Sequence, residues 1–552
     1  MLLRRPLAIV AAVTAVLGVA ACSGSSGSGK GSEAVLRIGT TGTVESLNPF
    51  TTSDSLTAEF FQAIYPHLVQ YDLHTRLPIG DFATKWVSSA NGKQLTFTLR
   101  RRATWSDGMP LGAADVAWTI NLMIKFQDDA TAAWAGAVTH ITKATATDAT
   151  TLVIDYDAQV ANTLALLARI PVLPRQDWAQ YATGDGKQLV HAAAAPTADR
   201  PLVSGGPFVF IKYVKGQSAL FRTNPKYYGK APHIAGFGVQ FFANDDAEVA
   251  ALKSDQIDVA TGTPSLEPTD IAPLKRAGFR ITQQGSLSFD DLIINTNPEK
   301  KTHKELLDPK VREAFEYATD RAKINEIALL GYGTLGASII PPASGAWHDT
   351  SVNPLPFDVT QANRLLDTAG YARGSNGIRR ALGHDMSYTL LVSQDVQGGQ
   401  RMGQLLTQSY AKIGVRLSVR IIDDDALEAA ITDDKYRTFD LAVWGWDVEY
   451  DPSYMLEAMT CDAYGDTNDS GYCNAGYDEL FAQQAVATVP VERQKLVNRM
   501  QEQIANQRPY IVLYYLPVLE GWSRSWSTVS ESPTGVLSGS SNSLLLSVRK
   551  TG

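Results

Sequence analysis

The residues best suited to chemistry lie between positions 439 and 452, where acidic and aromatic side chains interrupt an apolar run. A carboxylate that is closed away from water binds an ammonium group more strongly than a surface carboxylate does, and indole rings could stack against a sugar. The same pattern also fits an exposed acidic turn before Pro452, because acidic residues are common near proline turns. The residues concerned are Trp444, Gly445, Trp446, Asp447, Glu449 and Asp451.

Motifs for catalysis and for bound cofactors are missing from the sequence. It contains no phosphate-binding Walker loop, no GxSxG and no HExxH. Residues 331–336 match GxGxxG by letter, but they follow an apolar helix ending near Leu330 rather than a strand, so the match predicts a turn. The eight histidines are scattered, without a ligand-like cluster, which disfavours nickel. We therefore expect no enzyme activity, no cofactor and no metal site.

The first residues predict export. Arg4 and Arg5 precede an apolar run at 7–21 that is too short to span a bilayer and is typical of a signal peptide. The run ends in small residues before Cys22, a pattern similar to a bacterial lipobox, and a Gly/Ser-rich tether follows at 23–32. We expect Cys22 to carry lipid; the alternative is an ordinary secretory signal with an incidental cysteine.

Two further cysteines, Cys461 and Cys473, remain if Cys22 is lipidated. An even pair in an exported chain predicts a disulfide, which on the chain-entropy model stabilises the fold by about 3 kcal/mol. Zinc is the rival partner for these thiols, but no histidine lies near either cysteine.

Composition bounds the class of protein. The chain is 44% hydrophobic and 19% charged, and its more than 500 residues after Cys22 are too many for one core, so two or three domains are expected. The formal charge of −8 becomes −10 once Arg4 and Arg5 are removed, and the absence of a basic block argues against nucleic acid as a partner. No second apolar stretch approaches 18 residues.

Helix and strand signals are mixed. We expect a helix from Asp308 at its N-cap, a second from Asp358 to Gly370 and a third that carries Met402 and stops at Gly414. Alternating apolar residues predict strands at 95–99 and 415–421. Helices that lead into strands predict α/β layers, but periodicity does not give the strand order.

Seven segments in order along nearly the whole exported chain resemble the dipeptide/oligopeptide-type (family 5) solute-binding proteins of ABC importers. No single one is specific; their number and order carry the resemblance. They are LRIG at 36–39 with SLNP at 46–49, WSDGMP at 105–110 with ADV at 114–116, SGGPF at 204–208, NPKYY at 224–228, DPKVR at 308–312 with DR at 320–321, LLDTAGY at 365–371 and KIGV at 412–415.

This resemblance implies an α/β fold of the periplasmic-binding-protein type, a two-lobed class II-like clamp with an extra subdomain, three subdomains in all. The chain would cross between the lobes more than once. The expected division is a signal peptide at 1–21, a lipidated cysteine and tether at 22–32, lobe I at 33–65, subdomain II inserted at 66–190, lobe I again at 191–295, lobe II at 296–515 and the C-terminal part of lobe I at 516–552.

The resemblance also implies ligand contacts. In peptide-binding relatives the strand with the Gly-Trp pair bonds to the peptide backbone, and the acidic residue three positions after that tryptophan holds the free amine. That residue is Glu449 here, with Asp447 and Asp451 as stand-ins. We expect Trp444 and Trp446 to face opposite sides of the strand, so that one walls the groove; core positions for both are the alternative. Small polar residues would lie opposite, unless they are plain loop residues: Ser53, Asp54 and Ser55.

For a ligand carboxylate, the resemblance points to Arg401, since dipeptide-binding relatives place an arginine near the start of this helix. A guanidinium fork suits a carboxylate. A solvated helix arginine is the alternative.

The expected function is capture of di- to oligopeptides outside the cytoplasm and their delivery to ABC transporter permease subunits. The protein would be a monomer on the outer face of the cytoplasmic membrane, held by its lipid, or in the periplasm. Two alternatives stay open. The same fold could bind haem, glutathione, sugar or nickel, or the protein could be an envelope regulatory lipoprotein that transports nothing.

Overall fold

The computed structural model describes residues 34–52, 54–192, 194–197, 199–263, 265–432, 438–527, 532–538 and 541–551. Cys22, its tether and Ser53 lie outside these residues. Among the described helices none is both long and apolar enough to cross a membrane.

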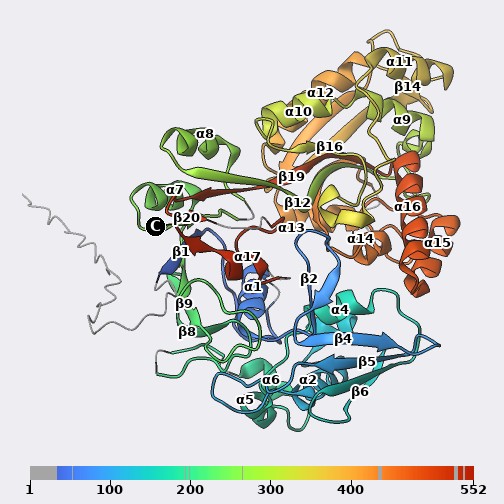
Figure 1. The fold of residues 1–552 in the computed structure, drawn as a ribbon. Coiled ribbons are helices and arrows are strands. Elements are labelled where there is room, and N and C mark those ends of the chain that lie inside the picture. The colour runs from blue at the N-terminus through green and yellow to red at the C-terminus, as the bar shows by residue number, and fades with distance from the viewer. Residues whose placement is uncertain are drawn as a thin grey trace, which may run out of the picture. The chain divides into compact units, whose positions relative to one another are not determined.

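One mixed sheet of eleven strands runs through the described chain (Figure 1). Its pairs are parallel and antiparallel, so its order could not be read from periodicity. The order is β17 (Arg416–Ile422), β16 (Ser387–Ser393), β18 (Leu441–Asp447), β12 (Arg280–Ile294), β19 (Tyr510–Trp522), β11 (Val259–Ala260), β1 (Val35–Thr40), β10 (Gly236–Phe241), β9 (Ser218–Thr223) and β8 (Phe208–Val214), with β13 (Thr334–Leu335) beside β19.

Two long strands join the halves of this sheet. β12 and β19 pair antiparallel over most of their length. The last residues of β12 also pair with β18, whereas the last residues of β19 pair with β11. Separate apolar cores lie on the two sides of this junction, one around β1 and β8–β10 and the other around β16–β18. The chain therefore forms two packed bodies that share a pair of central strands.

The predicted helices over the second core are confirmed. α9 (Pro309–Ala318) begins after Asp308, whose carboxylate accepts a hydrogen bond from the Lys310 amide at 2.8 Å. α11 (Val359–Thr368) and α12 (Gly399–Lys412) end before Gly370 and Gly414, both of which have positive φ. Only glycine adopts this conformation without a Cβ penalty, so these two residues stop the helices.

The predicted strands are confirmed as well. At 95–99 the structure has β5 (Gln94–Leu99), with the alternating apolar side chains buried. It belongs to a second sheet of order β4 (Ala83–Ser88), β5, β7 (Thr151–Tyr156) and β6 (Ile141–Ala146). At 415–421 it has β17, an edge strand whose Ile421 is exposed. Of the GxGxxG letters at 331–336, residues 331–333 form the predicted turn after α10 (Arg321–Ala328), whereas 334–335 form the short strand β13.

A disulfide joins Cys461 to Cys473, as the even pair predicted. It closes the loop between α14 (Ser453–Glu457) and α15 (Ala475–Val486).

Candidate functional site

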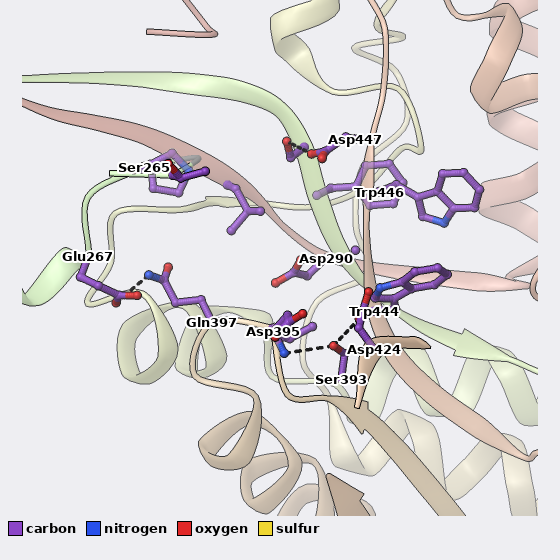
Figure 2. Close-up of a pocket in the computed structure, with 17 residues that line it drawn as sticks. Ser265, Glu267, Asp290, Ser393, Asp395, Gln397, Asp424, Trp444, Trp446 and Asp447 are labelled. Carbon is purple, nitrogen blue, oxygen red and sulfur yellow. Dashed lines mark hydrogen bonds between the residues drawn. The ribbon is translucent and has the colours of Figure 1, made fainter. Parts of the chain in front are cut away.

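A cavity of about 280 Å³ lies where the two central strands meet β18. Its wall comes from segments far apart in the sequence, and Figure 2 shows how the side chains converge. Its lining residues include Glu267, Ser288, Asp290, Ser393, Asp395, Val396, Gln397, Asp424, Trp444, Gly445, Trp446 and Asp447.

The end of β18 has one free edge. β16 pairs with β18 only from Leu441 to Val443, whereas β12 pairs with it along its whole length to Asp447. Within the described residues, the backbone of 444–447 is therefore bonded to a neighbouring strand on one side only, and all four residues line the cavity. An extended chain could add to this edge by main-chain hydrogen bonds.

Gly445 permits a close approach at this edge. It lies opposite Asp290 of β12, and a Cβ at Gly445 would come within 2.6 Å of the Asp290 Oδ1 atom. Any larger residue would displace that carboxyl group. Because glycine has no side chain, it leaves room for the Asp290 carboxyl group beside the strand, at the wall of the cavity.

Asp290 is 4% exposed, and its Oδ2 atom accepts a hydrogen bond from the Tyr514 hydroxyl at 2.7 Å. Burial raises the pKa of Asp290 to about 7; the Tyr514 bond opposes this rise and the charge of Asp447 adds to it. This carboxyl group therefore changes charge near neutral pH.

The cavity is strongly acidic. Five of its lining side chains are carboxylic acids, and among the described lining residues none is lysine or arginine. Several are fixed by neighbours: Gln397 Nε2 donates to Glu267 at 2.7 Å, Ser393 Oγ donates to Asp424 at 2.5 Å, and Ser288 Oγ donates to Asp447 (Figure 2). Such a wall favours a ligand that carries positive charge.

Both tryptophans of the Trp-Gly-Trp run are among the residues that line this cavity. The expectation that Trp444 and Trp446 face opposite sides is wrong, because residues two apart in a strand share a face. The two rings project to the same side (Figure 2) and pack against one apolar cluster. Both residues are half-buried.

Glu449, the first candidate for the amine contact, does not line the cavity. Its Oε1 atom lies 2.7 Å from Nη1 of Arg169, which ends α4 (Thr163–Arg169). Burial raises the pKa of Glu449, Arg169 lowers it and Asp451 raises it further. An incoming amine would have to replace Arg169 at this carboxylate.

Asp451 has a partner of its own. Its two carboxylate oxygens lie 2.7 and 2.8 Å from Nη1 and Nη2 of Arg493, on α16 (Pro490–Gln507), and both side chains are buried. A buried bidentate pair holds the loop to the helix, so Asp451 is engaged in structure.

The segment expected opposite the strand leads into a helix. Asp54 caps α1 (Ser55–Ile64): its carboxylate accepts from the Thr57 amide at 2.7 Å and from the Thr52 hydroxyl at 2.6 Å. Ser55 is the first residue of that helix, and neither residue lines the cavity.

Arg401 lines a second cavity of about 450 Å³. The two cavities share Glu267, Ser393, Val396 and Gln397, so they adjoin. Arg401 therefore lies in the cavity next to the one that the free edge of β18 lines.

Sequence reasoning missed Asp290 and Glu267. For Asp290 a signal existed: it is one of two adjacent acids within a strand that is otherwise apolar toward its end. A buried carboxyl group is costly, and its presence in such a strand points to a functional role. For Glu267, at the start of α8 (Pro268–Arg276), no comparable signal is present.

The expectation of no ligand-like histidine cluster is also corrected. His303 and His384, 81 positions apart in the sequence, flank Glu305 with one potential ligand atom each, all within 4.8 Å of one another. Sequence spacing could not show this, because His303 and Glu305 lie at the start of one short helix, whereas His384 comes from a distant strand.

A chain with two α/β bodies on shared central strands and a polar cavity beside them is built to hold a small ligand. The chain belongs to the bacterial extracellular solute-binding proteins of family 5, whose model for the middle region matches residues 78–466, well over half of the chain. It is thus an extracytoplasmic substrate-binding protein of the kind that serves ABC importers, and this family is not one of enzymes.

The Di/tripeptide-binding protein 1 of Pseudomonas aeruginosa is 24% identical over 499 residues, covering 86% of this chain and 87% of its own. The Helicobacter pylori periplasmic binding protein DppA, solved with the peptide STSA, has a TM-score of 0.71 at 20% identity and covers 94% of this chain and 98% of its own. NikZ of Campylobacter jejuni, solved with Ni(L-His), has a TM-score of 0.71 at 18% identity, with 91% and 96% covered. The expected α/β clamp with an extra subdomain is confirmed.

Proposed function

We propose that this protein captures di- to oligopeptides and delivers them to an ABC importer. One observation carries the cargo assignment: residues 444–447 of β18 present a free strand edge inside an acidic cavity. A carrier of many peptides must bind what all peptides share, which is the backbone and the charged termini. A free strand edge binds backbone regardless of side chains.

Asp447 is the proposed amine contact. It ends the free edge, it lines the cavity, and the Ser288 hydroxyl already orients its carboxylate. Glu449 remains a second candidate, which requires that Arg169 release it. Asp451 is set aside because Arg493 occupies both of its oxygens.

Arg401 is the proposed contact for the ligand carboxylate. A peptide whose amine meets Asp447 would extend along β18 from the first cavity toward the second, which Arg401 lines. Its fork geometry suits two carboxylate oxygens.

Identification of the bound ligand tests this proposed function. Mass spectrometry of protein purified without denaturation should detect bound peptides. Calorimetry on protein stripped of ligand should then show binding of short peptides. Release of a sugar, haem or a metal chelate instead, with no binding of peptides from two to nine residues, would reject the assignment.

Binding of a free-amine peptide should weaken as the pH falls from 8 to 5. The ionised form of Asp290, whose pKa burial raises to about 7, favours a cation nearby, and this form disappears below neutral pH. If only that form binds, affinity falls about tenfold for each pH unit below 7. Calorimetry across this range should show the slope in wild type and a flatter one in Asp290→Asn. If affinity depends on pH equally in wild type and Asp290→Asn, ionisation of Asp290 does not contribute to peptide binding.

We also propose that Cys22 carries the lipid anchor, on the strength of the small residues before it and the tether after it. Cys22→Ala should move the protein from the membrane fraction to the soluble extracytoplasmic fraction. Cell fractionation and immunoblotting measure this. Membrane association that persists in the variant contradicts lipidation at this residue.

The proposed lobe division has two crossing points, near residues 295 and 515. The second point has support, because position 515 lies within β19, which joins the two cores. At the first point β12 already pairs with β18 from Ser288 onward, so the crossing lies within β12, a few residues before 295.

A further inference from the structure

We propose that His303, Glu305 and His384 form a binding site for a divalent transition-metal ion of the zinc and nickel type. The site is separate from peptide capture, since none of the three residues lines either cavity.

The spacing of the potential ligand atoms fits one ion. Nδ1 of His303 lies 3.3 Å from Oε1 of Glu305, and Nε2 of His384 lies 3.5 Å from Oε2. Ligands at zinc distances of about 2.0–2.1 Å in a tetrahedral site are about 3.4 Å apart. The two imidazole rings are 4.9 Å apart between centroids and nearly perpendicular. An ion could therefore contact all three side chains after a small turn of His384.

The second layer of contacts orients these ligands. Nδ1 of His384 lies 3.1 Å from the carbonyl oxygen of Asp385, and a proton donated there leaves Nε2 free toward Glu305. The Tyr388 hydroxyl donates to Oε1 of Glu305 at 2.8 Å. Metal-binding histidines usually donate their other ring N–H to a carbonyl or carboxylate, and metal-binding carboxylates are themselves hydrogen-bonded.

A buried oxygen independently points to a missing ligand. Glu305 is 2% exposed, and its Oε2 atom accepts no hydrogen bond from the part of the chain that the structure describes. A buried carboxylate oxygen without a partner is costly. The neighbouring imidazole of His384 lies just beyond hydrogen-bond distance, and a cation between the two would satisfy both groups.

The backbone conformation of His303 also fixes its position beside Glu305. It has a φ of +53°, in the left-handed region, directly before the short helix η3 (Lys304–Leu307) that carries Glu305. His384 comes from β15 (His384–Asp385), which pairs with β14 (Arg380–Ala381) in a small hairpin. A bound ion would thus cross-link this hairpin to the segment before α9.

Donor chemistry selects the class of ion. Two imidazole nitrogens and one carboxylate oxygen suit zinc, nickel, cobalt or copper, whereas calcium and magnesium prefer oxygen ligands alone.

The probe is ZnCl₂, titrated by calorimetry into chelator-treated protein that has been freed of the chelator. Wild type should bind one equivalent, with an accompanying rise in the melting temperature. His384→Ala removes an accessible ligand in a hairpin and should weaken zinc at least tenfold. His303→Asn should do the same, because asparagine tolerates positive φ and so preserves the backbone.

His140→Ala is the matched control. His140 also lies beside one carboxylate, with Nδ1 3.0 Å from Oδ1 of Asp157. Among the described residues, however, this pair has no third side chain placed to complete a metal site. This variant should bind zinc as wild type does, and all variants should bind peptide equally. Zinc binding weaker than millimolar in wild type, or unchanged in both His303→Asn and His384→Ala, overturns the proposal and leaves a histidine–glutamate contact only.

Discussion

Asp447→Asn is expected to cost about 2–5 kcal/mol of binding free energy for a peptide with a free amino terminus, roughly a 30- to 4,000-fold loss of affinity, if the bound peptide buries this otherwise exposed carboxylate. The substitution keeps the shape of the side chain and the hydrogen bond that Ser288 can donate. It removes only the charge that pairs with the ammonium group. Calorimetry on protein stripped of ligand measures the loss.

A double-mutant cycle separates a direct contact from a general disturbance. N-acetylation of the peptide should weaken binding to wild type strongly but to Asp447→Asn little, and the coupling energy reports the pair. Asp424→Asn is the matched control, a second hydrogen-bonded carboxylate of the same cavity that lies off the free edge of β18. It should leave the acetylation effect intact.

The same cycle decides between the two candidate carboxylates. If Glu449→Gln shows the coupling and Asp447→Asn does not, the amine replaces Arg169 at Glu449 and the assignment moves by two residues. Equal affinity of acetylated and free peptides for wild type would exclude an amine anchor at either position.

Arg493→Met is expected to lower the free energy of unfolding by about 3–5 kcal/mol, because it leaves the carboxylate of Asp451 buried and unpaired. The guanidinium also donates to Ser453 and Gln484 and lies 4.6 Å from the centre of the Trp347 ring. Guanidinium chloride unfolding followed by tryptophan fluorescence measures the loss.

Lys495→Met, on the same helix, is the matched control. Lys495 pairs with Glu492 at 2.9 Å, but both side chains are exposed, 64% and 59%. An exposed pair contributes about 0–1 kcal/mol, so the control should unfold almost as wild type does. The double substitution Asp451→Asn with Arg493→Met should recover part of the loss, since the unpaired charge is then gone. Equal losses in Arg493→Met and Lys495→Met would show that the buried pair is not the source.

Local signals in the sequence determined individual elements and the class of protein. The caps and glycines around α9, α11 and α12 act within one turn of the chain, so their effect can be read from neighbouring residues. The order of the family segments predicted the clamp without any long-range geometry. The even cysteine pair likewise predicted the disulfide.

Only the tertiary structure decided which side chains meet. Glu449 was the leading amine contact by its position after Gly445-Trp446, yet it lies against Arg169, 280 positions earlier in the chain. Asp290 reaches the cavity because β12 places it opposite Gly445, a register that periodicity does not give. His303 and His384 flank Glu305 for the same reason. Such contacts arise from packing between distant segments, whereas sequence patterns report the local backbone, and this is why the strand with its Trp-Gly-Trp run was predictable but its partners were not.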